Sequence, residues 1–123
     1  MLNVPSVLVI DDDPDSLNAS TELLQSAGWS VITAQHGLEA LQHLHEGLRP
    51  RAMLIDLSMP TMDGRRFCEI CDAEPAFAHI PRIIVTAEYG ARAMKYRARA
   101  VVPKPVDSKR LLSALTAEFC LTD

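Results

Sequence analysis

The chain has 123 residues, of which 48% are apolar and 23% are charged. These values are typical of a globular domain and exclude a collagen-like, coiled-coil or largely disordered chain. The 16 acidic residues outnumber the 12 basic ones, which leaves a net charge of −4 and argues against direct binding to nucleic acid. No apolar run approaches the roughly 20 residues of a membrane span, and no secretory signal opens the chain, so we expect a cytoplasmic protein.

The cysteines and histidines do not have the spacing of a metal site. An odd, small number of cysteines predicts reduced thiols rather than a disulfide framework. Cys68 and Cys71 form a single C-x-x-C without a second ligand pair, so we interpret both as apolar residues of one helix face. The other residues of these types are Cys120, His36, His43, His45 and His79. We interpret the histidines as helix or surface residues.

Apolar residues recur with two periods, one typical of strands and one typical of amphipathic helices. In chain order, the expected elements are a strand at 6–10, a helix at 15–27, a strand at 29–34, a helix at 38–48, a strand at 52–55, a loop at 58–64, a helix at 67–74, a strand at 81–85, a short helix at 88–97, a strand at 100–102 and a helix at 108–119. Five strand–helix pairs predict an α/β fold in which helices cover both faces of a doubly wound parallel sheet.

Functional groups in such a fold collect at the carboxyl ends of the strands. The residues at these ends are Asp11, Asp12 and Asp13, then Asp56, Thr86 and Lys104. Two carboxylates about 4 Å apart repel each other by about 4 kcal/mol at an effective dielectric constant of 20, so the cluster needs water, protons or a cation. Mg²⁺ fits best because it binds one or two carboxylates together with waters and phosphate oxygens. With a lysine charge and a threonine hydroxyl, this edge has the groups that attack and hold a phosphoryl group.

Four motifs carry a resemblance to a known family. They are Val7–Asp13, the D-x-x-M-P-x-M-D-G run from Asp56 to Gly64, Val85-Thr86-Ala87 and Lys104-Pro105. In this order, and over nearly the whole chain, they resemble the receiver domain of bacterial two-component response regulators of the chemotaxis-regulator type. The resemblance implies a single receiver domain over residues 1–123. It also implies a flavodoxin-like sheet of strand order 2-1-3-4-5 with five helices, the fourth of them shortened.

The same resemblance implies roles for individual residues. Asp56 would accept a phosphoryl group from a sensor histidine kinase or a phosphotransfer protein. Asp12 would bind Mg²⁺ or Mn²⁺ directly, Asp11 through a water molecule, and Ser58 through its backbone carbonyl. The chain would not be an enzyme for other substrates, because it would catalyse only its own phosphorylation and dephosphorylation at Asp56.

Further positions would hold the acyl phosphate or tune its lifetime. Thr86 would donate a hydrogen bond to the phosphoryl group, and Lys104 would pair with it. The peptide bond between Lys104 and Pro105 would be cis, a form that proline permits. Ser58 and Glu88 would flank the phosphate and set how long it survives.

The chain departs from the family pattern shortly before Lys104. Val101 stands where family members usually carry an aromatic residue, and the interval 86–104 looks a few residues short. We therefore expect phosphorylation to act through an atypical switch on the surface formed by the fourth helix, the fifth strand and the fifth helix. That surface would meet a downstream effector or output domain, or a second copy in a homodimer, but no nucleic acid and no membrane.

Three other interpretations stay open at this point. A phosphatase of the haloacid-dehalogenase type would use Asp11 and Asp13, although Asp13 and Asp15 also suit the start of a helix. A flavin-binding module on the same fold would need a neutral phosphate-binding loop after the first strand. The main alternative is a receiver fold that only binds partners without being phosphorylated, and Val101 is the reason to keep it.

Overall fold

The computed structural model describes residues 6–56, 64–86, 100–103 and 107–120. For residues 64–65, 86, 101, 103 and 117–120, the structure describes the backbone only. The predicted helix at 88–97 lies outside the described residues.

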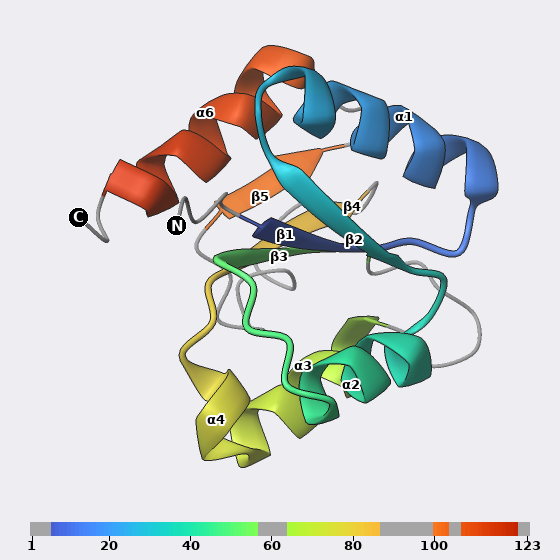
Figure 1. The fold of residues 1–123 in the computed structure, drawn as a ribbon, viewed down its shortest axis with the longest axis vertical. Coiled ribbons are helices and arrows are strands. Elements are labelled where there is room, and N and C mark those ends of the chain that lie inside the picture. Colours follow the sequence, from blue (N-terminus) through green and yellow to red (C-terminus); the bar gives the residue numbers. More distant parts are fainter. Residues whose placement is uncertain (1–5, 57–63, 87–99, 104–106, 121–123) are drawn as a thin grey trace.

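Five parallel strands form one sheet in the order β2-β1-β3-β4-β5 (Figure 1). The strands are β1 (Ser6–Ile10), β2 (Ser30–Ala34), β3 (Ala52–Asp56), β4 (Arg82–Thr86) and β5 (Ala100–Pro103). Val9 of β1 lies between Thr33 of β2 and Leu54 of β3, and Asp56 is opposite Val85 of β4. The predicted α/β fold and the strand order 2-1-3-4-5 are thereby confirmed.

Helices cover both faces of this sheet. The helices are α1 (Pro14–Ser26), α2 (Gly37–His45), α3 (Gly64–Ala73), the short α4 (Pro75–Ala78) and α6 (Ser108–Cys120). In Figure 1, α1 and α6 lie on one face of the sheet, whereas α2, α3 and α4 lie on the other. Among the described helices, none is long and apolar enough to cross a membrane.

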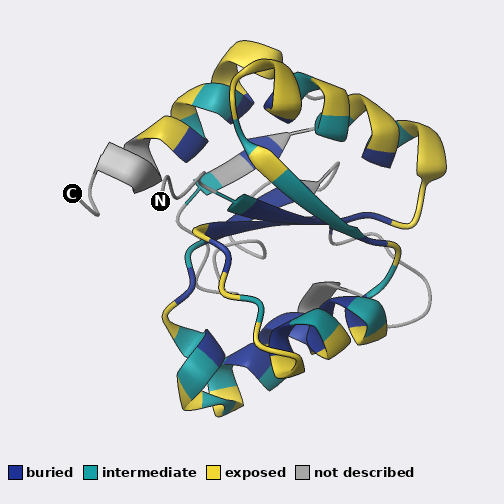
Figure 2. Cartoon of the chain, in the orientation of Figure 1, coloured by how far each residue is buried: buried dark blue, intermediate teal, exposed yellow. Residues whose placement is uncertain are grey.

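Each strand contributes side chains to two cores because successive residues point to opposite faces of the sheet. Val7 and Val9 belong to the core under α1 and α6, where Leu24 also packs. Leu8 and Ile10 belong to the core on the α2 and α3 side. Figure 2 shows the buried residues along the sheet and on the helix sides that face it. This alternation decides which way the polar residues at the strand ends point.

Two differences from the predicted elements have local causes. Gly28 ends α1 with a φ of +95°, a conformation that favours glycine. The backbone N–H of Trp29 then donates to the carbonyl of Leu24, so Trp29 belongs to this turn and β2 begins one residue later. The short helix α4 was not predicted because a single turn has no readable period. Pro75 opens it, and the Glu74 carboxylate accepts a hydrogen bond from its second residue.

The cysteine pair lies on one helix, as predicted. Cys68 and Cys71 are fully buried thiols of α3. Burial raises the pKa of the Cys71 thiol to about 11, although nearby Arg82 lowers it and Asp72 raises it. A thiol that stays protonated at neutral pH is a poor nucleophile and a poor metal ligand.

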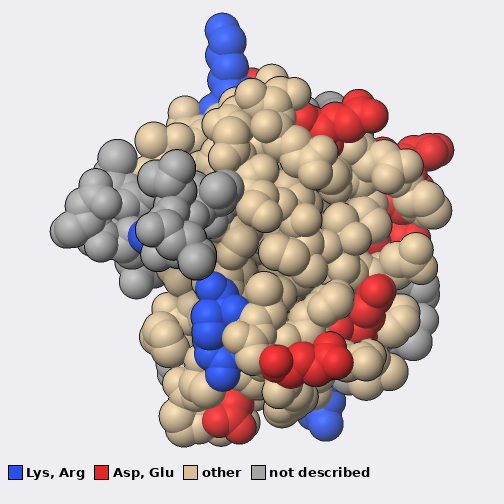
Figure 3. All heavy atoms as spheres, viewed as in Figure 1, with Lys and Arg blue, Asp and Glu red and all other residues tan. Residues whose placement is uncertain are grey.

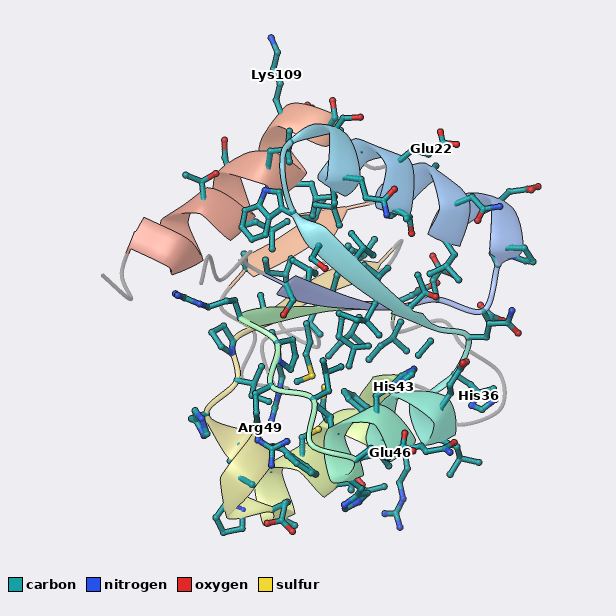
Figure 4. All side chains as sticks on the ribbon, viewed as in Figure 1. Glu22, His36, His43, Glu46, Arg49 and Lys109 are labelled. Atoms are coloured by element: carbon teal, nitrogen blue, oxygen red, sulfur yellow. The ribbon has the colours of Figure 1, made fainter. Side chains whose placement is uncertain are left out.

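Three of the histidines lie along α2. His36 is the N-cap of the helix, and its Nδ1 accepts a hydrogen bond from the backbone N–H of Glu39 at 3.1 Å. His45 near the other end packs edge-on against Phe77, with ring centroids 5.2 Å apart. His36 and His43 lie apart along the helix in Figure 4. These positions agree with the interpretation of the histidines as helix residues.

Candidate functional site: an acidic pocket at the carboxyl edge of the sheet

The carboxyl ends of β1 and β3 place two aspartates on the same side of the sheet. Asp11 follows β1 and is two residues past Val9, and Asp56 is two residues past Leu54. The period of two therefore turns both side chains toward the face that α1 covers. The backbone N–H of Asp11 also donates to the carbonyl of Ala34 at 3.0 Å, which holds this strand end beside β2.

Three carboxylates meet at this edge. Asp11, Asp12 and Asp56 each offer one oxygen, and these three oxygens lie within 4.8 Å of one another. The residues Asp11 and Asp56 are only 6% and 4% exposed, whereas Asp12 is exposed. The cluster therefore has a buried side and a side open to solvent. In Figure 3, acidic side chains gather on the right of the view, where the chain passes from the strand ends to α1 and α2.

The charge of this pocket suits a hard divalent cation. At about 4.8 Å, each pair of carboxylates repels by about 3 to 4 kcal/mol at an effective dielectric constant of 20. A divalent cation held by these oxygens would offset this repulsion. Carboxylate oxygens are the ligands that Mg²⁺ prefers, and the exposed side of the pocket leaves room for the waters that Mg²⁺ keeps. Asp11, Asp12 and Asp56 would hold the ion.

The other two acidic residues of this loop start α1, as predicted. Asp13 is the N-cap, and its Oδ1 accepts a hydrogen bond from the backbone N–H of Asp15 at 3.3 Å. Asp15 lies in the first turn, where the helix dipole favours a negative charge. The backbone N–H of Asp13 donates to Oδ1 of Asp11 at 3.0 Å. The capping role of Asp13 gives no support to a phosphatase that pairs Asp11 with Asp13.

The remaining predicted site residues are only partly described. Thr86 ends β4 and is opposite Pro103 in the register, while Val101 of β5 is opposite Ile84. The structure describes the backbone of these residues and not the side chains of Thr86 and Val101. The other predicted positions, Ser58, Glu88, Lys104 and Pro105, lie outside the described residues.

Two serines of α1 belong to the pocket but were not predicted. Ser16 and Ser20 line a hollow together with Asp11 and Asp56. The sequence does contain a signal for Ser20, because it lies between Leu17 and Leu24 at helical spacing. A residue at that position of the apolar stripe faces the sheet. In the fold, Ser20 lines the hollow together with residues of β1, β3 and β4. The helix pattern alone does not reveal this position.

The family of the chain follows from comparison with known proteins. The model of the response regulator receiver domain matches residues 7–116, a range that contains the whole sheet and the acidic pocket. The chain belongs to this family. Receiver domains act in two-component signalling, where they interact with histidine kinases and output effectors.

Individual relatives agree with this assignment. The chain is 30% identical over 107 residues to Protein Rrf1 of Nitratidesulfovibrio vulgaris, which covers 87% of this chain and 77% of that protein. It is also 30% identical over 115 residues to Protein PilG of Pseudomonas aeruginosa, covering 90% and 84% respectively. The solved structure of the chemotaxis protein CheY4 of Vibrio cholerae superposes with a TM-score of 0.86 at 26% identity. That match covers 94% of this chain and 98% of the other.

Proposed function

We propose that Asp56 is the phosphoacceptor of this receiver domain and that a sensor histidine kinase or a phosphotransfer protein is the donor. The observation that carries the proposal is the position of Asp56. Its carboxylate lies at the carboxyl end of the central strand β3, with two further carboxylates within 4.8 Å. A nucleophile surrounded by like charges suits a reaction in which a cation and a phosphoryl group arrive together.

The transfer forms one bond and breaks one. An Oδ of Asp56 bonds to phosphorus while the P–N bond of the phosphohistidine breaks. The electron pair of that bond stays on the imidazole, which takes up a proton from solvent. When bound, Mg²⁺ or Mn²⁺ offsets the negative charge of the carboxylates and of the phosphoryl oxygens. Asp12 would bind this cation directly, and Asp11 would help to hold it through a water molecule.

The residues beyond the acidic pocket complete the proposal. Thr86 donates to the acyl phosphate, Lys104 pairs with it, and the backbone carbonyl of Ser58 is a further cation ligand. Ser58 and Glu88 set the lifetime of the acyl phosphate. The chain acts as a catalyst only on itself. These roles rest on the family resemblance of the motifs.

We also propose that the acyl phosphate changes the output face through an atypical switch. Val101 has no aromatic ring that could swing between two positions, so the coupling between Asp56 and β5 must use another route. The partner at this face is an effector, an output domain or a second copy of the chain. NMR spectra with and without a phosphoryl mimic test the idea. Large shifts throughout residues 86–104, as an aromatic switch would give, would argue against it.

The second candidate is a receiver fold that binds partners without being phosphorylated, and Val101 is the observation that favours it. A flavin-binding module is less suited to this site, because three carboxylates at the strand ends repel a phosphate group unless a cation is bound. A colourless purified protein would agree with that exclusion.

Intact-mass measurement after incubation with a small phosphodonor and Mg²⁺ decides between the first two candidates. We expect a gain of one phosphoryl group in the wild type and none in Asp56→Asn or in the presence of a chelator. Asp15→Asn is the matched control, because Asp15 lies in the first turn of α1, close to Asp12 in the sequence but outside the three-carboxylate cluster. A wild-type chain that gains nothing, from the small donor or from a cognate kinase, would favour the binding module.

A further inference from the structure

The hollow beside Asp56 is lined by both apolar and polar residues. The apolar ones include Val9, Leu54 and Val85 from three neighbouring strands. The polar ones are Ser16 and Ser20 of α1 and the carboxylate residues Asp11 and Asp56. The centre of a water molecule can move within about 10 Å³ of this hollow. The hollow therefore has room for about one water molecule.

The two serines differ from the other hydroxyl residues of α1. Thr21 donates to the carbonyl of Leu17 at 2.8 Å, and Ser26 donates to the carbonyl of Glu22 at 2.8 Å. Within the described part of the chain, the hydroxyls of Ser16 and Ser20 have no such hydrogen bond. Both serines are half-buried, and they are one helical turn apart, so their side chains lie on the same face of α1. Each hydroxyl therefore has a donor and an acceptor position to offer in the hollow.

The hollow also contains hydrogen-bond acceptors. The nearly buried carboxylates of Asp11 and Asp56 accept hydrogen bonds only. A water molecule between the serines and the carboxylates can accept from a hydroxyl and donate to a carboxylate. A buried water is stable when it has two to four polar partners, and this hollow offers four.

We propose that Ser16 and Ser20 hold one water molecule that donates to the carboxylates of Asp11 and Asp56, and that the two serines thereby orient these carboxylates for the cation. The serines are positioning residues, because they act through the water and not on the cation itself. The inference rests on the cation role proposed for Asp11 and Asp56. Groups that orient metal ligands in this way contribute about tenfold or more to metal affinity.

The test is Mg²⁺ binding by calorimetry to the whole chain. Ser16→Ala and Ser20→Ala should each weaken binding by about tenfold. The double variant should bind no more weakly than the poorer single variant, because both serines hold the same water. Ser26→Ala is the matched control on the same helix and should leave Mg²⁺ affinity unchanged. Circular dichroism confirms that each variant keeps its fold, as alanine favours helices.

A crystal structure of the wild type gives the direct test of the water. We expect one ordered water within hydrogen-bond distance of both serine Oγ atoms, and its loss in the double alanine variant. An empty hollow, unchanged Mg²⁺ affinity in the variants, additive losses or a wild type that binds no Mg²⁺ would overturn the inference. Serine-dependent Mg²⁺ binding in a chain that takes up no phosphoryl group would support the inference and reject only the phosphorylation proposal.

Discussion

Two neighbouring strands carry buried charged residues at opposite ends, and the two ends are built differently. At the carboxyl end of β3, Asp56 gathers with two other carboxylates. At the amino end of β4, Arg82 is 1% exposed, and its Nη2 lies 2.8 Å from Oδ1 of Asp72 on α3. The first site brings like charges together, and the second brings opposite charges together.

The cluster of like charges suits the binding of a cation, whereas the ion pair of opposite charges stabilises the fold. In the ion pair, the negative charge of Asp72 offsets the positive charge of Arg82 inside the molecule. The acidic pocket instead brings three carboxylates within 4.8 Å of one another at a strand edge, where a cation and a phosphoryl group would offset their repulsion. Opposite charges meet at one end of these strands, and like charges gather at the other.

The largest effect should follow from breaking the matched pair. Arg82→Ala removes a large buried side chain together with the partner of Asp72, so we expect a loss of about 3 to 5 kcal/mol in the free energy of unfolding. Urea denaturation measures this loss. Replacing both partners, Arg82→Met with Asp72→Ala, should recover most of it, because a buried ion pair and a well-packed apolar pair have similar stability. A double variant as unstable as Arg82→Ala would contradict this account of the pair.

Added Mg²⁺ should stabilise the folded chain by binding at the acidic pocket. Mg²⁺ at about 100 times its dissociation constant should raise the free energy of unfolding by about 2.7 kcal/mol. The same concentration should stabilise Asp12→Asn much less, because one of the three clustered carboxylates becomes a neutral amide. Thermal melts with and without Mg²⁺ measure both values. Equal stabilisation of the wild type and Asp12→Asn would place the cation elsewhere.

Alkaline pH should lower the free energy of unfolding through Cys71, a buried thiol of α3 close to Arg82. The pKa of Cys71 is raised by burial to about 11 from an ordinary value of 9.0. The folded state therefore holds this proton more tightly than the unfolded state does, and its contribution is complete below pH 9 and is lost as the pH rises toward 11. The loss should reach at most about 3 kcal/mol. Cys71→Ala should flatten the decline in unfolding free energy between pH 9 and pH 11, and an unchanged slope would contradict the assignment.

The smallest effect is expected from an exposed ion pair. Nη1 of Arg66 lies 3.4 Å from Oε2 of Glu69 on α3, and both side chains are more than 60% exposed. Solvent screens this pair, so Arg66→Ala should change the free energy of unfolding by less than about 1 kcal/mol. It is the surface counterpart of Arg82→Ala in the same denaturation series. A loss as large as that of Arg82→Ala would show that burial does not explain the difference.

The strand ends of the acidic pocket were predictable from the sequence, whereas the ion pair was not. Short β-branched runs followed by aspartates predict both the strands and the edge where Asp11, Asp12 and Asp56 meet. Arg82 opens a strand, and a charged residue there is expected in solvent. Its partner Asp72 lies on the preceding helix, so only the packing of α3 against the sheet brings the two together.

The serines were missed for a related reason. Leu17 and Leu24 lie at helical spacing and form the buried stripe of α1, but a pattern of apolar residues gives no weight to a hydroxyl within that stripe. The role of Ser20 depends on the strand ends across from it. Local sequence determines where the elements form, and the contents of a pocket between elements depend on several distant segments at once.

Locating the phosphoryl group tests the central claim most directly. After incubation with a small phosphodonor and Mg²⁺, reduction by borohydride converts an aspartyl phosphate to homoserine, which peptide mass mapping can place in the chain. We predict homoserine at position 56 and at no other aspartate, with none formed when a chelator is present. Modification at Asp11 or Asp12, or an unmodified Asp56 in a chain that has gained a phosphoryl group, would contradict the account.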